Sequence, residues 1–131
     1  DVRIFLNQVL PHARDVPVVI AHAGGWGGLD SNTWDAMDAF RRLIGGQPDK
    51  APNLYFDLAQ VFDAETSASN RARLVEVMRG IGLDRFVPGS DWPFSSALDD
   101  YFNHAMLQLP LSPTEMTRLR QRQIALRRLA H

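Results

Sequence analysis

The chain has 131 residues, a net charge of −1, 45% hydrophobic residues and 22% charged residues. A length in the range of ~100–200 residues fits one domain, and the balanced charge gives no overall attraction to nucleic acid or to a membrane surface. There is no cysteine, which excludes disulfides, zinc ribbons and thiol nucleophiles and leaves His, Asp and Glu as possible metal ligands. We expect a single cytoplasmic domain over residues 1–131.

The chain begins with a predicted helix, strand and second helix. Residues 2–10 repeat apolar residues at helical spacing, and Pro11 ends that helix. Residues 18–22 are too few for a helix and rich in β-branched residues, so they predict a strand, and their continuous apolar character favours burial on both faces. A second helix follows the capping residue Asp30 and ends at Gly45. Its inward stripe is predicted to be Thr33, Met37, Phe40 and Ile44.

The rest of the chain continues the alternation. Residues 53–59 and 86–91 predict two more strands, with a third helix over residues 67–82 between them. A terminal helix is expected over about residues 113–129, with Ser112 as its cap. Because each crossover contains a helix, this order predicts βαβ units and a parallel sheet of the α/β class. The third helix is predicted to turn inward Leu74, Val75, Met78 and Ile81.

Three parallel strands are few for a complete sheet. An open sheet of this size leaves two hydrophobic edges exposed, whereas a closed barrel of eight strands has none and takes about 250 residues. About half of such a barrel would have the element order of this chain. In open sheets and barrels alike the ligand site lies at the carboxyl ends of the strands, where His22, Asp57 and Asp91 are expected.

His22 and Asp91 are residue types suited to metal chemistry. A divalent metal ion lowers the pKa of its water from 15.7 toward ~7, and a nearby carboxylate such as Asp91 can accept the remaining proton. A neutral histidine can bind the metal or donate to a developing oxyanion. The residues alone also allow a structural role, with His22 as a hydrogen-bonded core residue and Asp91 as a turn cap.

Three further candidates each have two interpretations. Asp57 either faces the site or accepts hydrogen bonds from backbone amides at its strand end. Trp26 and Trp92 either line an apolar substrate pocket or only pack loops over the sheet. The other histidines and the terminal basic run are predicted to lie at the surface, without nucleic-acid contact; these residues are His12, His104, His131, Arg118, Arg120, Arg122, Arg127 and Arg128.

Three stretches carry a resemblance to a known family: "VVIAHAGG" at 18–25, "NLYFDLA" at 53–59 and, most specifically, "FVPGSDWPF" at 86–94. Together they resemble the C-terminal half of the amidohydrolase superfamily, in its amidohydrolase-related branch of metal-dependent TIM-barrel hydrolases and decarboxylases. The resemblance implies the C-terminal part of a (β/α)8 barrel, with about three parallel βα units, a flanking N-terminal helix and C-terminal helices.

The same resemblance implies roles and a cofactor. His22 corresponds to the strand-six histidine, which binds the metal in some branches and polarises the substrate or holds the water in others. Asp91 corresponds to the strand-eight aspartate, which approaches the metal and takes a proton from the attacking water. The implied cofactor is a divalent metal ion, zinc first, with manganese, iron or cobalt also suited to such ligands.

The implied function is hydrolysis of a small-molecule carboxylic ester, lactone or amide by metal-activated water. One alternative is a metal-dependent non-oxidative decarboxylase of the same fold, and another is a non-catalytic half-barrel that serves as a binding or assembly module. The family's His-x-His pair is absent from these residues, and two ligands are fewer than the three of a catalytic zinc site. We therefore expect the isolated 131 residues to be inactive, and their open edge to favour homo-oligomers.

Overall fold

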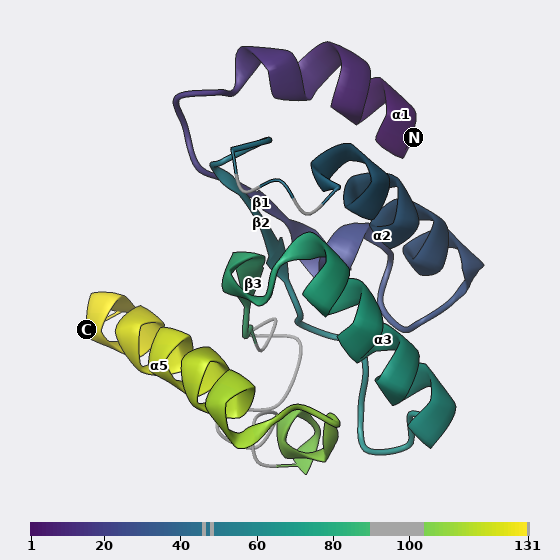
Figure 1. Ribbon diagram of the computed structural model, residues 1–131, viewed down its shortest axis with the longest axis vertical. Coiled ribbons are helices and arrows are strands. Elements are labelled where there is room, and N and C mark those ends of the chain that lie inside the picture. The colour runs from purple at the N-terminus through teal and green to yellow at the C-terminus, as the bar shows by residue number, and fades with distance from the viewer. Residues whose placement is uncertain (46, 48, 90–103, 131) are drawn as a thin grey trace.

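The protein contains a three-stranded parallel sheet with helices packed beside it (Figure 1). This computed structural model describes the backbone of residues 1–45, 47, 49–89 and 104–130, and the side chains of these residues as far as 122. The strands are β1 (Val18–Ile20), β2 (Leu54–Asp57) and β3 (Phe86–Val87), in the order β1-β2-β3. Both pairings are parallel. The predicted α/β class and parallel sheet are therefore confirmed, with shorter strands than expected.

The first helical segment is irregular. The helix α1 (Val2–Ile4) continues as a π-helix over Phe5–Val9 and as a 3₁₀-helix over Leu10–His12. The expectation that Pro11 ends the helix is wrong, because the helical path continues through it to His12. A proline near the start of a new short helix is tolerated, since its missing N–H would have no partner there.

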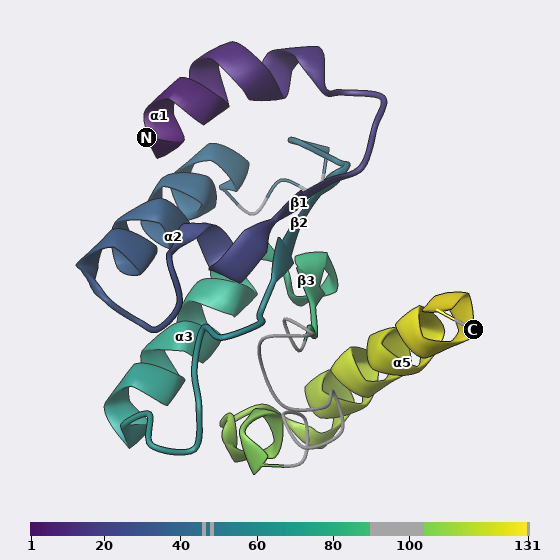
Figure 2. The same cartoon turned by 180° about the vertical axis from the view of Figure 1, so that it is seen from behind.

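The helices α2 (Ser31–Ile44) and α3 (Ala68–Ile81) begin and end at the predicted signals. Asp30 caps α2 by accepting a hydrogen bond from the Thr33 amide, and Ser67 caps α3 by accepting one from the Asn70 amide. Gly45 ends α2 in the left-handed conformation that glycine adopts without strain. All eight residues predicted to point inward from these two helices are buried. In both views, α2 and α3 lie on the same side of the sheet (Figures 1 and 2).

Four phenylalanine rings connect the first helical segment to the sheet. Phe40 on α2 makes edge contacts with Phe5, at 6.2 Å between ring centroids, and with Phe56 on β2, at 4.9 Å. Phe56 stacks on Phe86 of β3 at 5.3 Å. Because Phe56 and Phe86 are paired in register, their rings lie on the same face of the sheet. This face, covered by α2, carries the hydrophobic core.

The opposite face of the sheet is open within the described residues. Val19, at the centre of β1, is 56% exposed, and its register partner Tyr55 is only partly buried. The prediction that residues 18–22 are buried on both faces is therefore wrong in this structure. The physical reason is the strand period of two, which turns Val19 away from α2 toward a side that no described element covers.

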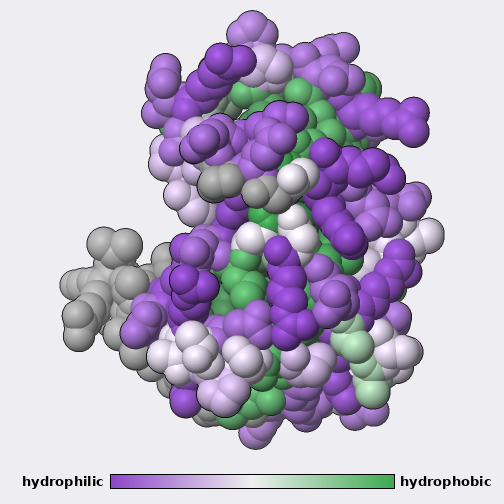
Figure 3. All heavy atoms as spheres, in the orientation of Figure 1, coloured by the Kyte–Doolittle hydropathy of each residue, from purple (hydrophilic) through white to green (hydrophobic). Residues whose placement is uncertain are grey.

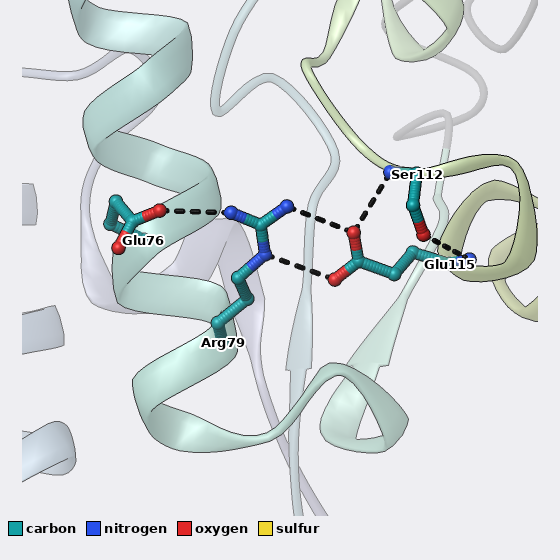
Figure 4. A network of polar contacts seen from close by, with 4 residues as sticks. All are labelled: Glu76, Arg79, Ser112 and Glu115. Atoms are coloured by element: carbon teal, nitrogen blue, oxygen red, sulfur yellow. Dashed lines mark hydrogen bonds and ion pairs between the residues drawn. The ribbon is translucent and has the colours of Figure 1, made fainter.

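The C-terminal helix α5 (Pro113–Ala130) lies beside β3 and the short 3₁₀-helix η4 (Leu83–Arg85). The predicted cap is confirmed, because the Ser112 hydroxyl accepts from the Glu115 amide while the Glu115 carboxylate accepts from the Ser112 amide. Figure 4 shows that the same carboxylate also receives a two-pronged hydrogen bond from Arg79 of α3, at 2.9 and 3.0 Å. These bonds, with Arg79 first, lower the pKa of Glu115 to about 2.

Arg85 closes the amino end of the sheet. It is 9% exposed and donates to the carbonyl oxygens of Lys50 at 2.7 Å, Leu54 at 3.2 Å, and Ala51. Burial lowers the pKa of this guanidinium from its ordinary value, but arginine stays protonated in proteins. The buried charge therefore ties the segment before β2 to the start of β3.

Candidate functional site

Two of the predicted site residues meet at the carboxyl ends of the strands. β1 ends at Ile20, so His22 lies two residues beyond the strand, and Asp57 is the last residue of β2. Asp91 and Trp92 lie outside the described residues. The carboxyl ends of parallel strands are where α/β proteins place their ligand sites. His22 and Asp57 are therefore the described residues from which a site can be built.

His22 has an unusual backbone conformation. Its φ and ψ are 51° and 33°, and the following Ala23 has φ 52° and ψ 27°. A left-handed conformation costs a residue with a side chain about 1–2 kcal/mol, and such costs concentrate at functional sites. Ala23 is fully buried, so the surrounding packing holds both residues in place.

One ring nitrogen of His22 is already committed to the backbone. Nδ1 lies 2.7 Å from the carbonyl oxygen of Ala59, which follows β2. Because a carbonyl oxygen can only accept, Nδ1 must carry the proton in this contact. In the neutral ring the lone pair is then on Nε2, which forms no hydrogen bond within the described part of the chain. Metal-binding histidines commonly show this arrangement, with the second nitrogen donating to a carbonyl.

Asp57 fixes the same turn from the other side. Its Oδ1 accepts a hydrogen bond of 2.7 Å from the amide of Ala59. The structure thus realises one of the two predicted alternatives, in which Asp57 bonds a backbone amide at its strand end. The carboxylate also lies against Gly89, where an added Cβ would be 2.3 Å from Oδ1. Glycine at 89 therefore permits the backbone that follows β3 to approach this carboxylate.

The loops after β1 and β2 are joined by a further hydrogen bond. The amide of Gly28 donates to the carbonyl oxygen of Gln60 at 2.6 Å, and the buried Thr33 hydroxyl donates to Gly28 at 2.8 Å. Thr33 also lowers the pKa of Asp30 below its ordinary value, mainly through the amide that Asp30 caps. This arrangement anchors the loop that follows His22 to the start of α2.

The remaining predicted residues lie apart from this turn. Trp26 is 90% exposed and does not line the cavity described below. The predicted surface positions of His12 and His104 are confirmed, and Arg118 and Arg120 are exposed as well. His131 is outside the described residues, and the side chains of Arg127 and Arg128 lie beyond the described ones.

A cavity of about 580 Å³ lies at the opposite end of the sheet. It is lined by Leu6 and Leu10 of the first helical segment, Val18 at the start of β1, and the segment that leads into β2. Figure 3 shows hydrophobic surface beneath α1, in the upper part of the view. Because Val18 and Leu54 begin their strands, the cavity is at the amino ends, away from His22 and Asp57.

The residues that the structure describes contain no group of three or more His, Cys, Asp or Glu side chains that could hold a metal ion. His22 fits the donor chemistry of one ligand, through Nε2, and Asp57 uses at least one carboxylate oxygen for the Ala59 amide. A complete metal centre would therefore need ligands from outside the described ranges. Nor is any helix in these ranges both long and apolar enough to cross a membrane.

The fold and this turn define an α/β protein with its candidate site at the carboxyl ends of parallel strands. A sequence profile described as amidohydrolase matches residues 3–121. The chain belongs to the amidohydrolase family, as the resemblance in "VVIAHAGG" and "FVPGSDWPF" implied. That family is generally metal-dependent.

A solved structure similar to this chain is amidohydrolase 2 from Bifidobacterium longum subsp. infantis. The two are 18% identical with a TM-score of 0.45, and the match covers 87% of this chain. The chain spans 43% of the length of that structure. No curated protein gives a significant match.

Sequence reasoning missed two residues of the turn, Ala59 and Gly89. The carbonyl group of Ala59 is a backbone feature that any residue would supply, so no side-chain pattern marks it. A weak signal did exist, because an Asp two residues before a loop residue often accepts from that residue's amide. Gly89 could have been noted as a glycine inside the predicted strand 86–91, where a glycine often marks a close approach of another group.

Proposed function

We propose that this chain is part of a metal-dependent hydrolase that uses metal-activated water on a small-molecule carboxylic ester, lactone or amide. The observation that carries the proposal is His22, whose Nδ1 is bonded to Ala59 while its left-handed backbone leaves Nε2 without a described partner. Membership of the amidohydrolase family gives this geometry a chemical context.

In this proposal, the chain supplies three βα units of a larger (β/α)8 barrel. The exposed side chain of Val19 supports it, because parallel strands are normally buried on both faces. The open face of β1 and β2 would then turn toward the barrel interior. The ligands that the described residues lack would come from outside these ranges, and Asp91 is the first candidate by its family likeness.

A divalent metal ion, when bound, supplies an activated water at neutral pH. His22 would offer Nε2 as a metal ligand when the ring is neutral. When the ring carries a proton on both nitrogens, Nε2 would instead donate a hydrogen bond to the substrate carbonyl. Asp91 would accept the proton that the attacking water releases. The hydrogen bond from Nδ1 to Ala59 would hold the His22 ring at a fixed orientation in either role.

The test is metal content by elemental analysis of the longest soluble form of the protein. We expect near-stoichiometric metal in the wild type and a clear fall in metal content in His22→Ala, because that substitution removes a ligand. His12→Ala is the matched control, because His12 is an exposed histidine of the first helical segment. Asp91→Asn is tested together with His22→Ala, and we expect the metal content to fall in at least one of the two variants.

Two results would overturn the proposal. A metal-free protein with full activity would remove the metal, and unchanged metal in both His22→Ala and Asp91→Asn would place the centre elsewhere. If metal is present, product analysis in water labelled with ¹⁸O separates the reactions, because a hydrolase transfers the water oxygen to its product. Release of carbon dioxide without such incorporation would replace the hydrolase with the decarboxylase of the same fold.

A further inference from the structure

The Asp57 carboxylate and the His22 ring are connected through a single residue. Asp57 Oδ1 accepts from the amide of Ala59 at 2.7 Å, and the carbonyl oxygen of Ala59 accepts from His22 Nδ1 at 2.7 Å. Ala59 itself is fully buried. Asp57 therefore acts on the residue whose carbonyl group selects the protonated nitrogen of His22.

The surroundings restrict the position of this carboxylate. Gly89 lies two residues after β3, and a Cβ at this position would be only 2.3 Å from Asp57 Oδ1. β2 and β3 are paired nearby through Asp57 and Val87. In addition, the amide of Leu58 donates to the carbonyl oxygen of Val87 at 3.0 Å. The turn from Asp57 to Ala59 is thus held by the third strand as well as by its own hydrogen bond.

We propose that Asp57 is a positioning residue: by fixing Ala59, it keeps neutral His22 in the tautomer with the proton on Nδ1 and the lone pair on Nε2. The chemical value of that lone pair rests on the proposed function, whereas the tautomer is a property of the chain itself. A histidine free in water favours the opposite tautomer, with the proton on Nε2. The turn would therefore reverse the ring's own preference.

The expected cause is geometric. Without the Asp57 hydrogen bond, the peptide groups after β2 can rotate, and the Ala59 carbonyl is no longer held toward Nδ1. The left-handed backbone of His22 and Ala23 is held by packing, but within the described residues the hydrogen bond to Ala59 is the one that fixes the orientation of the ring. A change at Asp57 should then appear at His22 through Ala59, which is hydrogen-bonded to both side chains.

The experiment uses the longest soluble form of the protein, metal-free and labelled with ¹⁵N at histidine. Long-range ¹H–¹⁵N correlation spectra, recorded at a pH where the ring is neutral, show which nitrogen carries the proton, and His22→Gln identifies the His22 signals. We expect Nδ1–H in the wild type. Asp57→Ala should convert at least half of the population to Nε2–H, whereas Asp57→Asn, which retains an acceptor oxygen, should keep Nδ1–H.

Asp63→Ala is the matched control. Asp63 also accepts from an amide two residues ahead, that of Glu65 at 2.9 Å, but in an exposed loop. It should leave the His22 tautomer unchanged. If Asp57→Ala does not fold, Asp57→Val replaces it, because a β-branched residue suits the last position of a strand.

Wild-type His22 with its proton on Nε2 would overturn the inference. So would a folded Asp57→Ala or Asp57→Val variant with the wild-type tautomer. These outcomes are independent of metal content: a metal-free protein with the expected tautomers would contradict the proposed function and leave the positioning role in place. In a form that binds metal, the same variants should weaken its affinity about 10–100-fold.

Discussion

At the amino ends of the strands the buried Arg85 gives its hydrogen bonds to the carbonyl oxygens of Lys50, Ala51 and Leu54. At the carboxyl ends, His22 gives one bond to Ala59 and keeps its second nitrogen without a described partner. Non-glycine residues with positive φ occur at both places, Ala51 (φ 48°) at the first and His22 (φ 51°) at the second. Polar groups at one end of this sheet thus serve to hold the chain, whereas the other end retains a group that can react.

The largest expected effect is at the amino end. Replacement of Arg85 by methionine (Arg85→Met) removes the buried donor that the carbonyl groups of Lys50, Ala51 and Leu54 share, so the free energy of unfolding should fall by about 3 kcal/mol. Urea unfolding measures it. Arg73→Met is the control, because Arg73 is 51% exposed, with its guanidinium over the Trp34 ring and 3.8 Å from Asp38. A loss of similar size in both variants would contradict the structural role assigned to Arg85.

The second effect concerns the carboxyl end. In Gly89→Ala the new Cβ would lie 2.3 Å from Asp57 Oδ1, so the turn must move and the free energy of unfolding should fall by about 1–3 kcal/mol. Thermal unfolding with the His22 tautomer spectrum checks both consequences. Gly80→Ala is the control, because its new Cβ would meet only the flexible Arg41 side chain, at 2.8 Å. Alanine also favours the helical conformation of α3, so this variant should lose less stability than Gly89→Ala. A Gly89→Ala protein as stable as wild type would mean that the three strand ends are not tightly packed.

The smallest effect is at the surface, away from both ends. Arg79 and the cap bonds lower the pKa of Glu115 to about 2 from an ordinary value near 4.5. Since the folded-state pKa is the lower one, the carboxylate stabilises the fold above about pH 4.5, and this contribution disappears as the pH falls toward 2. The urea midpoints of wild type and Glu115→Gln should therefore converge over that range.

Glu76→Gln provides the comparison for that pair. Glu76 meets Arg79 by one contact of 2.9 Å and is 69% exposed, so its removal should change the urea midpoint less at neutral pH. Figure 4 shows why, since Glu115 is the carboxylate that Arg79 holds with two nitrogens. An equal effect of both variants would show that the cap at Ser112 adds nothing.

Local sequence signals predicted the elements on the covered side of the sheet. Asp30, Gly45 and Gly82 mark helix ends whatever the rest of the molecule does, and the spacing of apolar residues identifies the buried face of α2 and α3. The exposure of Val19 was not predictable, because a strand pattern says which residues share a face but not whether another element covers it.

The candidate site was predictable only in part. His22 and Asp57 follow from their places after apolar runs, and the family follows from the stretches that contain them. The left-handed turn at His22 could not be predicted from the sequence, because residues other than glycine adopt this conformation only when tertiary contacts impose it. The partner of His22 Nδ1 could not be predicted either. Ala59 contributes a peptide carbonyl, which any residue has, and it lies 37 residues after His22 in the sequence.

The phenylalanine rings that pass from Phe5 through Phe40 and Phe56 to Phe86 also bear on how this sequence can change. Side chains in contact do not act independently when they are replaced. Whether a smaller ring is tolerated at Phe40 therefore depends on the residue already present at Phe56, and the reverse holds equally. The order in which substitutions at Phe40 and Phe56 arise during evolution therefore matters. The two single variants that lead to the same double variant differ in stability, so one order can be accessible when the other is not.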